Sequence, residues 1–314
     1  YATIKRIADL EYGRHVLCMQ MYKLNKQQGT GRKQYFSNVV MKLNIKAGGI
    51  NYALNFDNLA YKHKTIIMGA DVTHPGVGQC AGFPSIACVV GSVDDMFMNY
   101  PGSMRLQAGR QEEITDLGSM VTERLKAWQK KQGGRVPEHI IFYRDGISES
   151  QFEACLRKEI PAIRNAHREF ATNVPGRNNL KLTFIVVGKR HNTRFYALDT
   201  ADVTSINYEE EGKSNLNVRA GLYVDDFITD PIVKKSEGGT TEFDFYLQSH
   251  QAIKGTARSA HYHVLTNDIG LSKASLADLT HKLCYAFSRA TKGVSYAAPA
   301  YIADRLCERG RVYL

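Results

Sequence analysis

Hydrophobic residues recur along the chain at two different periods, and these periods separate predicted strands from predicted helices. Short runs of apolar and β-branched residues are typical of buried strands. Such runs occupy residues 65–70, 84–93, 96–107, 139–144, 181–187, 242–248 and 259–265. The third run is broken at Pro101–Gly102, a dipeptide that favours a turn. The pattern therefore predicts a core built around a sheet.

Other segments carry apolar residues every three or four positions, which is the period of an amphipathic helix. The longest covers residues 110–131 and would start at Glu112 and Glu113, where negative charge suits a helix N-terminus. Another helix opens after a capping box at Ser148–Gln151, and Pro161 is expected to kink it. Two further helices are predicted, one capped by Ser275 and one over residues 299–309.

The order of these elements limits the fold class. Three consecutive strands can form an antiparallel meander, whereas strands separated by helices add in parallel. The sequence therefore predicts an α/β fold, a mixed sheet flanked by helices. Residues 195–241, which include the acidic run Glu209–Glu211, are expected to form long loops.

Positive charge is concentrated in the first part of the chain. The 314 residues carry a net charge of +10, and residues 1–65 hold 11 Lys and Arg against three acidic residues. This balance suits an anionic partner such as nucleic acid, and a solubilising surface explains it equally well. Residues 27–34 are predicted to form a loop and residues 38–46 a helix, on which Lys42 and Lys46 share one face. An anion between these two ammonium groups would relieve their repulsion.

Neither the cysteines nor the apolar runs indicate an exported or membrane-spanning chain. The six cysteines form no Cys-x-x-Cys pair and no zinc-ligand spacing, so we expect reduced core residues of an intracellular protein. The apolar runs are far shorter than the roughly 20 residues that span a bilayer, so no transmembrane helix is expected. The first residue is Tyr1, which predicts a fragment or a processed product.

Two aspartates directly follow predicted buried strands. Asp71 comes after the strand 65–70, and Asp145 comes after the strand 139–144. Ligands bind at the carboxyl ends of strands in α/β sheets, so neighbouring strands would bring the two acids together. Adjacent carboxylates need a proton or a cation between them, and oxygen ligands suit Mg²⁺ or Mn²⁺. Strand-end aspartates are also common turn residues, so both explanations stay open at this point.

Other polar residues carry a weaker signal when each is taken alone. Asp304 lies beside Arg305 on the last predicted helix, as exposed ion pairs often do. His261 and His263 point to one face of a strand, but without a third ligand a packing or surface role is favoured over a metal site. The pair Gly76–Gly78 precedes no helix and lacks Lys-Ser/Thr, which argues against a phosphate-binding loop.

Seven stretches of the sequence together resemble Argonaute proteins of the eukaryotic type. They are Gly69-Ala-Asp-Val-Thr-His-Pro75, Arg110-Gln-Glu112, Ile141-Phe-Tyr-Arg-Asp-Gly146, Phe184-Ile-Val-Val187 with Lys189-Arg-His191, Glu242-Phe-Asp-Phe-Tyr246, His261-Tyr-His-Val264 and Ala298-Pro-Ala-Tyr301. They occur in the family's order along the whole chain. The resemblance implies the C-terminal part of a MID domain over residues 1–60. It also implies a PIWI domain with an RNase H-like fold and an incomplete C-terminus over residues 61–314.

The resemblance further implies small-RNA-guided cleavage of RNA, the slicer activity of RNA interference. The four catalytic positions of the family are matched by Asp71, Glu112, Asp145 and Asp304. Two Mg²⁺ or Mn²⁺ ions are implied, with Asp71, Asp145 and Asp304 as their ligands. Many animal members carry His at the position of Asp304, where Asp is an accepted ligand. Metal-activated water would attack the scissile phosphate in line and leave a 5′-phosphate on the downstream product.

A second set of matches implies a pocket for the 5′-phosphate of the guide. Its residues are Tyr1, Lys5, Lys42, Lys46 and Arg309. Tyr1 is implied to stack on the first base, and Arg309 to reach the same pocket from the far end of the chain. One position that is usually Gln in the family is Leu17 here, and His15 is a candidate substitute.

A third set matches residues along the guide backbone, whose contacts position a strand without reading its sequence. These residues are Lys189, Arg194, Arg258, Arg289, Ser295 and Tyr301. The implied partners are a small guide RNA with a 5′-phosphate, a complementary target RNA read by base pairing, and proteins of a silencing complex. No membrane partner is expected, and the implied location is cytoplasmic.

Two other functions stay open on the sequence. The first is an Argonaute that holds guide and target but silences through partner proteins without cleavage. The second is an unguided RNase H-like nuclease, against which the 5′-phosphate pocket argues. Retained silencing with lost cleavage after Asp71→Ala would favour the first.

Overall fold

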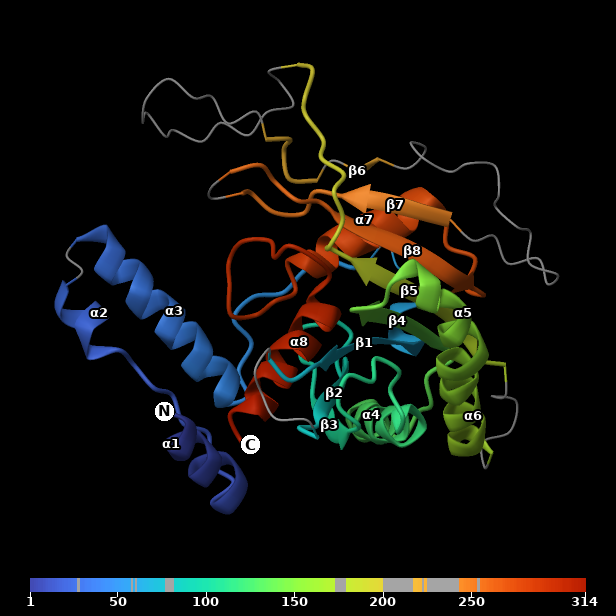
Figure 1. The fold of residues 1–314 in the computed structure, drawn as a ribbon, viewed down its shortest axis with the longest axis horizontal. Helices are drawn as coiled ribbons and strands as arrows, with labels where there is room; N and C mark the ends of the chain where they lie inside the picture. Colours follow the sequence, from blue (N-terminus) through green and yellow to red (C-terminus); the bar gives the residue numbers. More distant parts are fainter. Residues whose placement is uncertain are drawn as a thin grey trace.

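An eight-stranded mixed sheet lies at the centre of the described part of the protein (Figure 1). The computed structural model describes residues 1–26, 29–57, 59, 61–76, 82–172, 179–199, 217–221, 223–224, 243–252 and 255–314. Its strands are β1 (Thr65–Thr73), β2 (Ser85–Gly91), β3 (Gly102–Gln107), β4 (His139–Asp145), β5 (Lys181–Gly188), β6 (Tyr223–Val224), β7 (Phe243–Leu247) and β8 (Ala260–Asn267). They lie in the order β3-β2-β1-β4-β5-β8-β7-β6.

The strand directions confirm the predicted topology. β1, β2 and β3 form an antiparallel meander, and β4 and β5 add to β1 in parallel. β8 and β7 then extend the sheet with antiparallel pairs. The prediction of a mixed sheet flanked by helices is therefore correct.

Helices cover both faces of the sheet. The α-helices within the described residues are α1 (Ala2–Arg6), α2 (Met21–Lys26), α3 (Thr30–Lys46), α4 (Leu117–Lys131), α5 (Phe152–Ala154), α6 (Ile160–Ala171), α7 (Lys273–Cys284) and α8 (Ala298–Arg311). One apolar core joins α7 and α8 to one face, and a second core joins α4 and α6 to the other. Helix α8 lies very close to β1, because a Cβ on Gly69 would stand 2.1 Å from the carbonyl carbon of Pro299.

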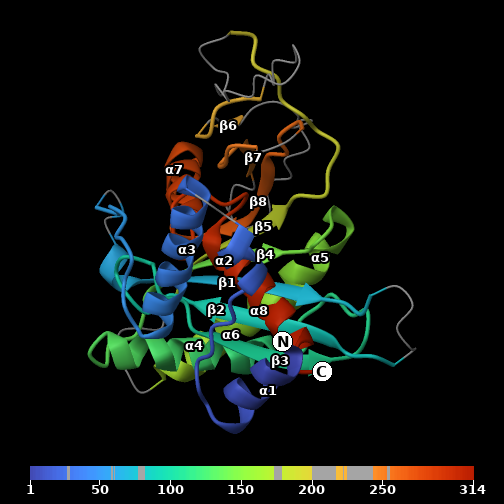
Figure 2. The same cartoon turned by 90° about the vertical axis from the view of Figure 1, so that its left-hand side faces the viewer.

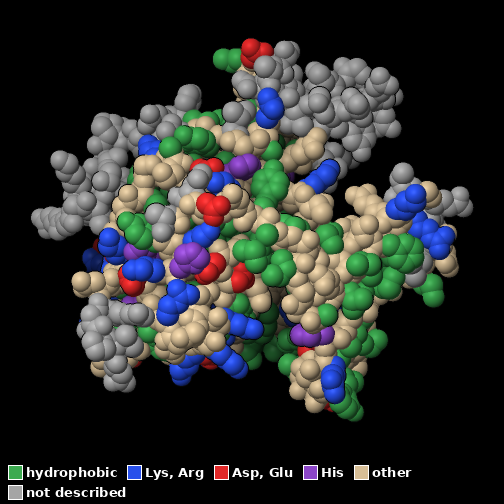
Figure 3. Space-filling model, turned by 180° about the vertical axis from the view of Figure 1, so that it is seen from behind, with side chains coloured by type: hydrophobic (Ala, Val, Ile, Leu, Met, Phe, Trp, Pro, Cys, Tyr) green, Lys and Arg blue, Asp and Glu red, His purple; other side chains and the backbone are tan. Residues whose placement is uncertain are grey.

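The N-terminal helices α1 to α3 lie beside this layered body, and the two chain ends lie close together in both views (Figures 1 and 2). Asn51 fixes the segment after α3 to the body, since its amide donates to the carbonyl oxygen of Ser288 at 2.7 Å. The hydroxyl of Tyr52 lies 2.7 Å from the carbonyl oxygen of Ala290. Apolar side chains such as Met21, Val40 and Leu43 are exposed on α2 and α3. Figure 3 shows hydrophobic side chains on the surface of this N-terminal part, on its right-hand side.

Two predicted boundaries are wrong because side chains capture backbone groups. The third predicted strand covered residues 96–107, whereas β3 begins only at Gly102. The carboxylate of Asp94 accepts hydrogen bonds from the backbone N–H groups of Met96, Met98 and Asn99, which folds that segment into a turn.

The predicted helix over residues 110–131 begins only at Leu117. Before it, the side chain of Gln107 donates to the carbonyl oxygens of Gln111 and Glu113, and Arg144 donates to that of Glu112. Carbonyl groups used in this way do not pair along a helix. Glu112 and Glu113 therefore lie in a loop and do not start the helix.

Three smaller differences concern helix ends. The predicted loop over residues 27–34 is wrong from Thr30 onward, because α3 begins there. The apolar residues of α3 do not recur at a helical period, so the pattern gave no signal for its start. Residues 27 and 28 lie outside the described residues. Ser272, not Ser275, caps α7, since its hydroxyl accepts from the backbone N–H of Ser275. The capping box at Ser148–Gln151 is confirmed, and the interruption expected at Pro161 is a π-helical turn just before it, over Cys155–Glu159.

Four of the described cysteines are free and buried, as expected, namely Cys88, Cys155, Cys284 and Cys307. Cys18 is also free but exposed, so the expectation of a core position is wrong for it, and Cys80 lies outside the described residues. Every helix within the described ranges is too short or too polar to cross a membrane. Of the predicted loops over 195–241, most residues fall outside the described ones, as do Gly78 and Glu242.

Candidate functional site

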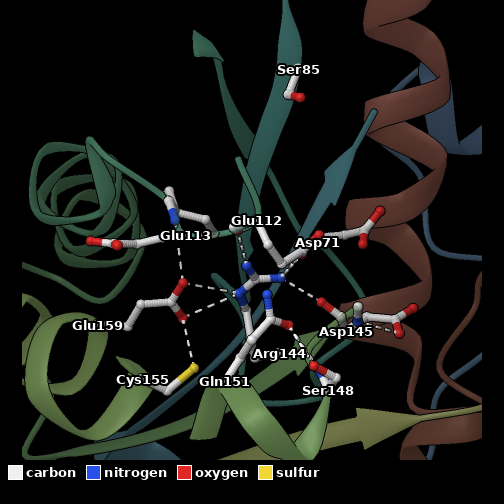
Figure 4. Close-up of polar contacts among 12 residues, drawn as sticks. Asp71, Ser85, Glu112, Glu113, Arg144, Asp145, Ser148, Gln151, Cys155 and Glu159 are labelled. Carbon is white, nitrogen blue, oxygen red and sulfur yellow. Dashed lines mark hydrogen bonds and ion pairs between the residues drawn. The ribbon is translucent and has the colours of Figure 1, made fainter. Parts of the chain in front are cut away.

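Acidic side chains gather where β1 and β4 meet α8 (Figure 4). In the parallel pair, Ala70 lies opposite Arg144, so Asp71 and Asp145 take the next position on adjacent strands. Asp71 lies within β1 and Asp145 is the last residue of β4, which corrects the prediction that both follow their strands. The expected proximity of the two acids is nevertheless observed.

Glu112 borders the same space as Asp71. A Cβ placed on Gly146 would lie 2.9 Å from Oε1 of Glu112 and 3.5 Å from Oδ1 of Asp71. Gly146 adopts φ +89°, a conformation that suits glycine. A side chain at this position would therefore crowd Glu112 and be strained by the backbone conformation.

The electrostatics of these acids are strongly perturbed. Burial raises the pKa of Asp71 to about 7, and the negative charges of Asp145 and Asp304 contribute in the same direction. Burial also raises the pKa of Asp145 to about 6, although hydrogen bonds from Tyr296 and the backbone of Gly146 oppose this shift. Each carboxyl therefore holds a proton up to nearly neutral pH unless a cation takes its place. A set of carboxylate oxygens in this state fits Mg²⁺ or Mn²⁺.

A buried arginine links Glu112 to the sheet. Arg144 has a fully buried side chain, and its Nη1 lies 3.2 Å from Oε1 of Glu112. Its Nε lies 3.2 Å from Oε2 of Glu159, a second buried carboxylate. On the other side, Nε2 of His74 lies 2.7 Å from Oε2 of Glu112, and Nδ1 of His74 lies 2.8 Å from Oγ of Ser85. Both oxygens of Glu112 are thus held by fixed groups.

Sequence reasoning assigned no role to three of these supporting residues. His74 and Arg144 stand in the same motifs as Asp71 and Asp145, so their places in the sequence could have indicated a role at the site. Glu159 had none, because it comes from a helical segment with no motif. Its role depends on the tertiary contact with Arg144.

Asp304 reaches the acidic group from α8. Its carboxylate accepts hydrogen bonds from Arg305, with Nη2 at 2.5 Å and Nε at 3.0 Å. This agrees with the ion pair expected from the sequence. Its charge also raises the pKa of both Asp71 and Asp145, which places it beside them.

A second site is a cavity of about 540 Å³ between the N-terminal segment and α8. Its lining includes all five residues predicted to hold a phosphate, namely Tyr1, Lys5, Lys42, Lys46 and Arg309. Leu17 and Cys18 also line it. His15 does not belong to this lining and is exposed, so the structure does not place it as a substitute for the family's Gln.

Positive charge dominates this cavity. The ammonium groups of Lys5 and Lys46 both donate to the carbonyl oxygen of Val16, from Lys46 at 2.8 Å. Burial and the nearby charge of Lys5 lower the pKa of Lys46. Arg309 pairs with Asp9 at 2.5 Å and donates to the hydroxyl of Tyr1 at 3.2 Å. An anion bound here would meet cations from both ends of the chain.

Residues predicted along the guide backbone lead from this cavity towards the acids. The guanidinium of Arg289, which also lines the cavity, lies 4.9 Å from the ring centre of Phe287. Tyr301 packs edge-on against Phe287 and Tyr296, with ring centres 4.9 and 5.3 Å apart. Tyr296 in turn hydrogen-bonds Asp145, and Lys189 lies 5.8 Å from the Tyr296 ring.

The other three residues predicted to contact the guide backbone are less closely connected to this series of contacts. Arg258 is exposed. Burial of Lys189 is the main cause that lowers its pKa to about 8, and the positive charge of Arg258 acts in the same direction. Ser295 is half-buried beside Tyr296 in the chain. Arg194 donates to the carbonyl oxygens of His191 and Thr193 at 3.0 and 2.7 Å. Its guanidinium therefore lies against its own segment beyond β5.

His261 and His263 do not lie alone on their strand. Both are packed, as the sequence favoured, but Asp244 from β7 joins them. Nε2 of His261 lies 2.6 Å from Oδ2 of Asp244. Sequence reasoning missed Asp244, although it stands in the Phe-Asp-Phe-Tyr stretch.

Comparison with known proteins identifies the family. The Piwi domain matches residues 1–314. Protein argonaute 5 of Arabidopsis thaliana is 40% identical over 334 residues, covering 100% of this chain and 31% of the relative. Protein argonaute 18 of Oryza sativa subsp. japonica is 39% identical over 319 residues, covering 100% of this chain and 27% of the relative. The chain thus spans at most about a third of these relatives.

Solved structures give the same result. The C-terminal lobe of a budding yeast Argonaute superposes with a TM-score of 0.84 at 34% identity, over 100% of this chain and 60% of that one. The Argonaute of Kluyveromyces polysporus, solved with a guide RNA, superposes with a TM-score of 0.83 at 34% identity, over 100% of this chain and 36% of that one. The chain therefore belongs to the Argonaute family and has the RNase H-like fold of its Piwi domain.

Proposed function

We propose that this chain contains the guide-anchoring and RNA-cleaving parts of a small-RNA-guided endoribonuclease. One observation carries the proposal: Asp71 and Asp145 lie side by side on adjacent parallel strands, where burial and neighbouring carboxylates raise the pKa of both carboxyls. Such a pair is unfavourable for folding alone and favourable for binding a divalent cation. Glu112 and Asp304 complete the proposed set of four.

The donor atoms suit two Mg²⁺ or Mn²⁺ ions, with Asp71, Asp145 and Asp304 as the proposed ligands. When bound, such ions would activate water and neutralise charge on the scissile phosphate, leaving a 5′-phosphate on the downstream product.

The surrounding residues would keep the acids in position. Tyr296 donates to Asp145 and so orients its carboxylate. His74 and Arg144 hold the two oxygens of Glu112, which keeps this side chain beside Asp71. Arg144 also compensates part of the negative charge gathered here.

The cationic cavity would bind the 5′-phosphate of the guide. Lys5, Lys46 and Arg309 supply charged donors, and Tyr1 offers an aromatic face for the first base. The proposed guide-backbone residues continue from the cavity to the acids. An RNA anchored at its 5′ end would then lie along this path, and the target would be read by base pairing. We also propose that the boundary between the MID and PIWI parts lies near residue 60. We propose a cytoplasmic location for the protein.

Guided cleavage by the purified chain tests the proposal. The chain is loaded with a 5′-phosphorylated guide, and cleavage of a labelled complementary RNA is followed as Mg²⁺ is titrated. We expect cleavage at one position that EDTA abolishes and that Asp71→Ala or Asp304→Ala reduces by at least about 100-fold. Asp278→Ala, which changes an exposed acid on α7, is the matched control.

Four results would contradict the proposal. Cleavage that continues in EDTA, or that Asp304→Ala leaves unchanged, would overturn the assignment of the acids. Cleavage of a duplex without any guide would favour an unguided nuclease. Tight binding of guide and target without cleavage would favour a silencing effector that acts through partner proteins.

A further inference from the structure

A second cluster of metal-ligating side chains lies on other strands of the sheet. His261 and His263 alternate on β8, and Asp244 lies directly opposite His263 on the adjacent β7. All three side chains therefore project from the same face. This face is opposite to the one where Phe245 and Tyr262 pack against the core with α7 and α8. The proposed catalytic acids stand instead on β1 and β4, and β5 separates β4 from β8.

We propose that Asp244, His261 and His263 bind one divalent transition-metal ion, with Zn²⁺ as the best match. Each residue offers one ligand atom, and these atoms all lie within 4.8 Å of one another. Two imidazoles and one carboxylate with a fourth position open to water is a common zinc arrangement. This inference is independent of the guided cleavage proposed above.

The cluster needs little rearrangement to take the ion. Ligand atoms on a tetrahedral zinc stand about 3.3 Å apart, because each bond is about 2.0–2.1 Å long. The contact between His261 Nε2 and Asp244 Oδ2, 2.6 Å long, would open by less than 1 Å. Metal binding would replace this direct contact with one bond from each residue to the ion.

Surrounding rings hold the two histidines in place. Tyr246 stacks on His261 with ring centres 3.9 Å apart and planes 7° from parallel. The ring of His263 lies 3.8 Å from that of His261 and 4.9 Å from that of Phe152. Preorganised ligands of this kind lose little freedom when they bind a metal.

A simple ion pair between Asp244 and His261 does not account for His263. Within the described part of the chain, His263 has ring neighbours but no hydrogen-bond partner, although it is only partly exposed. The side chains of His261 and Asp244 are 11% and 20% exposed, which leaves the cluster a route to solvent. A metal ion would engage His263 together with the other two residues.

The donor set separates this site from the proposed catalytic one. Imidazole nitrogens suit zinc and related transition metals, whereas Mg²⁺ prefers oxygen ligands. Excess Mg²⁺ should therefore fill the carboxylate site and leave the histidine site to zinc. A bound ion would join β7 to β8 through ligands from both strands.

Metal content of the purified full chain tests the inference. The chain is stripped with a chelator, returned to zinc in the presence of millimolar Mg²⁺, and analysed for bound metal. We expect one zinc per chain, retained in Asp71→Ala and bound at least about 100-fold more weakly in His263→Ala. His63→Ala is the matched control, because the exposed His63 lies 2.6 Å from Asp95 and the described residues place no third ligand beside this pair.

X-ray absorption of the zinc-loaded wild-type chain provides a second measurement that needs no variant to fold. We expect scattering from two imidazoles and a light oxygen or nitrogen shell. Absence of zinc from the wild type under these conditions, zinc binding unchanged in a folded His263→Ala chain, or a spectrum without imidazole would each overturn the inference.

Discussion

Replacing Asp71 with Asn should make the metal-free protein more stable while abolishing cleavage. Asp71 is buried beside Asp145, and burial is the main cause of its raised pKa. Asn has nearly the same shape but no charge to bury. The gain in the free energy of unfolding therefore measures how much the buried carboxylate destabilises the fold. Such a gain is expected where a functional group opposes stability.

The magnitude follows from the pKa of Asp71. This value is about 7 in the folded protein against 3.8 for an unperturbed carboxyl. The folded state therefore binds more protons than the unfolded state between these pH values, so stability falls as pH rises through this window. Each pKa unit corresponds to about 1.4 kcal/mol, which gives a full cost of about 4 kcal/mol above pH 7. Below about pH 4 the cost disappears because both states are protonated.

Urea unfolding in EDTA at pH 5, 6, 7 and 8 measures this effect. We expect the advantage of Asp71→Asn over wild type to grow by about 1.4 kcal/mol per pH unit and to level off near pH 7. Asp116→Asn is the control with the opposite sign, since hydrogen bonding from Ser119 lowers the pKa of Asp116. That variant should lose a little stability at neutral pH, and the loss should fade as pH falls.

Two outcomes would refute the reasoning. If Asp71→Asn were no more stable than wild type at pH 8, burial and the neighbouring carboxylates would not disfavour the charged form of Asp71. An equal gain at pH 5 and pH 8 would show that the effect is one of packing and not of charge.

Three further predictions concern other contacts. Glu159→Gln removes one of the two carboxylates that pair with the buried Arg144 and should reduce the free energy of unfolding by about 3 kcal/mol in urea titrations, whereas an unchanged value would contradict the contribution of this pair. Gly69→Ala should cost about 3 kcal/mol or prevent folding, as seen by thermal melting, because the new methyl group would collide with Pro299; a wild-type melting temperature would contradict this close approach. Lys46→Met should weaken binding of a 5′-phosphorylated guide by about 10- to 100-fold in filter binding, with no change for a 5′-hydroxyl guide.

Features that depend on neighbouring residues were predictable from the sequence. The strands near β1, β4 and β5 and their directions follow from apolar runs and from the helices between them. The cap at Ser148 depends only on residues three positions apart and is also correct. The motifs then indicated which acids to compare, and the structure brings Asp71 and Asp145 together.

Features that depend on contacts between distant residues were not predictable in this way. The loop before α4 exists because Gln107 and Arg144 take backbone carbonyls that a helix would use. Neither donor is visible in the pattern of residues 110–116 itself. Glu112 reaches Asp71 only because of that loop.

The sequence by itself determined the directions of the central strands, the family and the acids that stand in the family's motifs. Only the tertiary structure decided which side chains face one another, as when Asp244 on β7 meets two histidines of β8. The physical reason is range: periodicity and capping act over a few residues, whereas electrostatic repulsion, burial and ligand geometry depend on groups brought together by the whole fold.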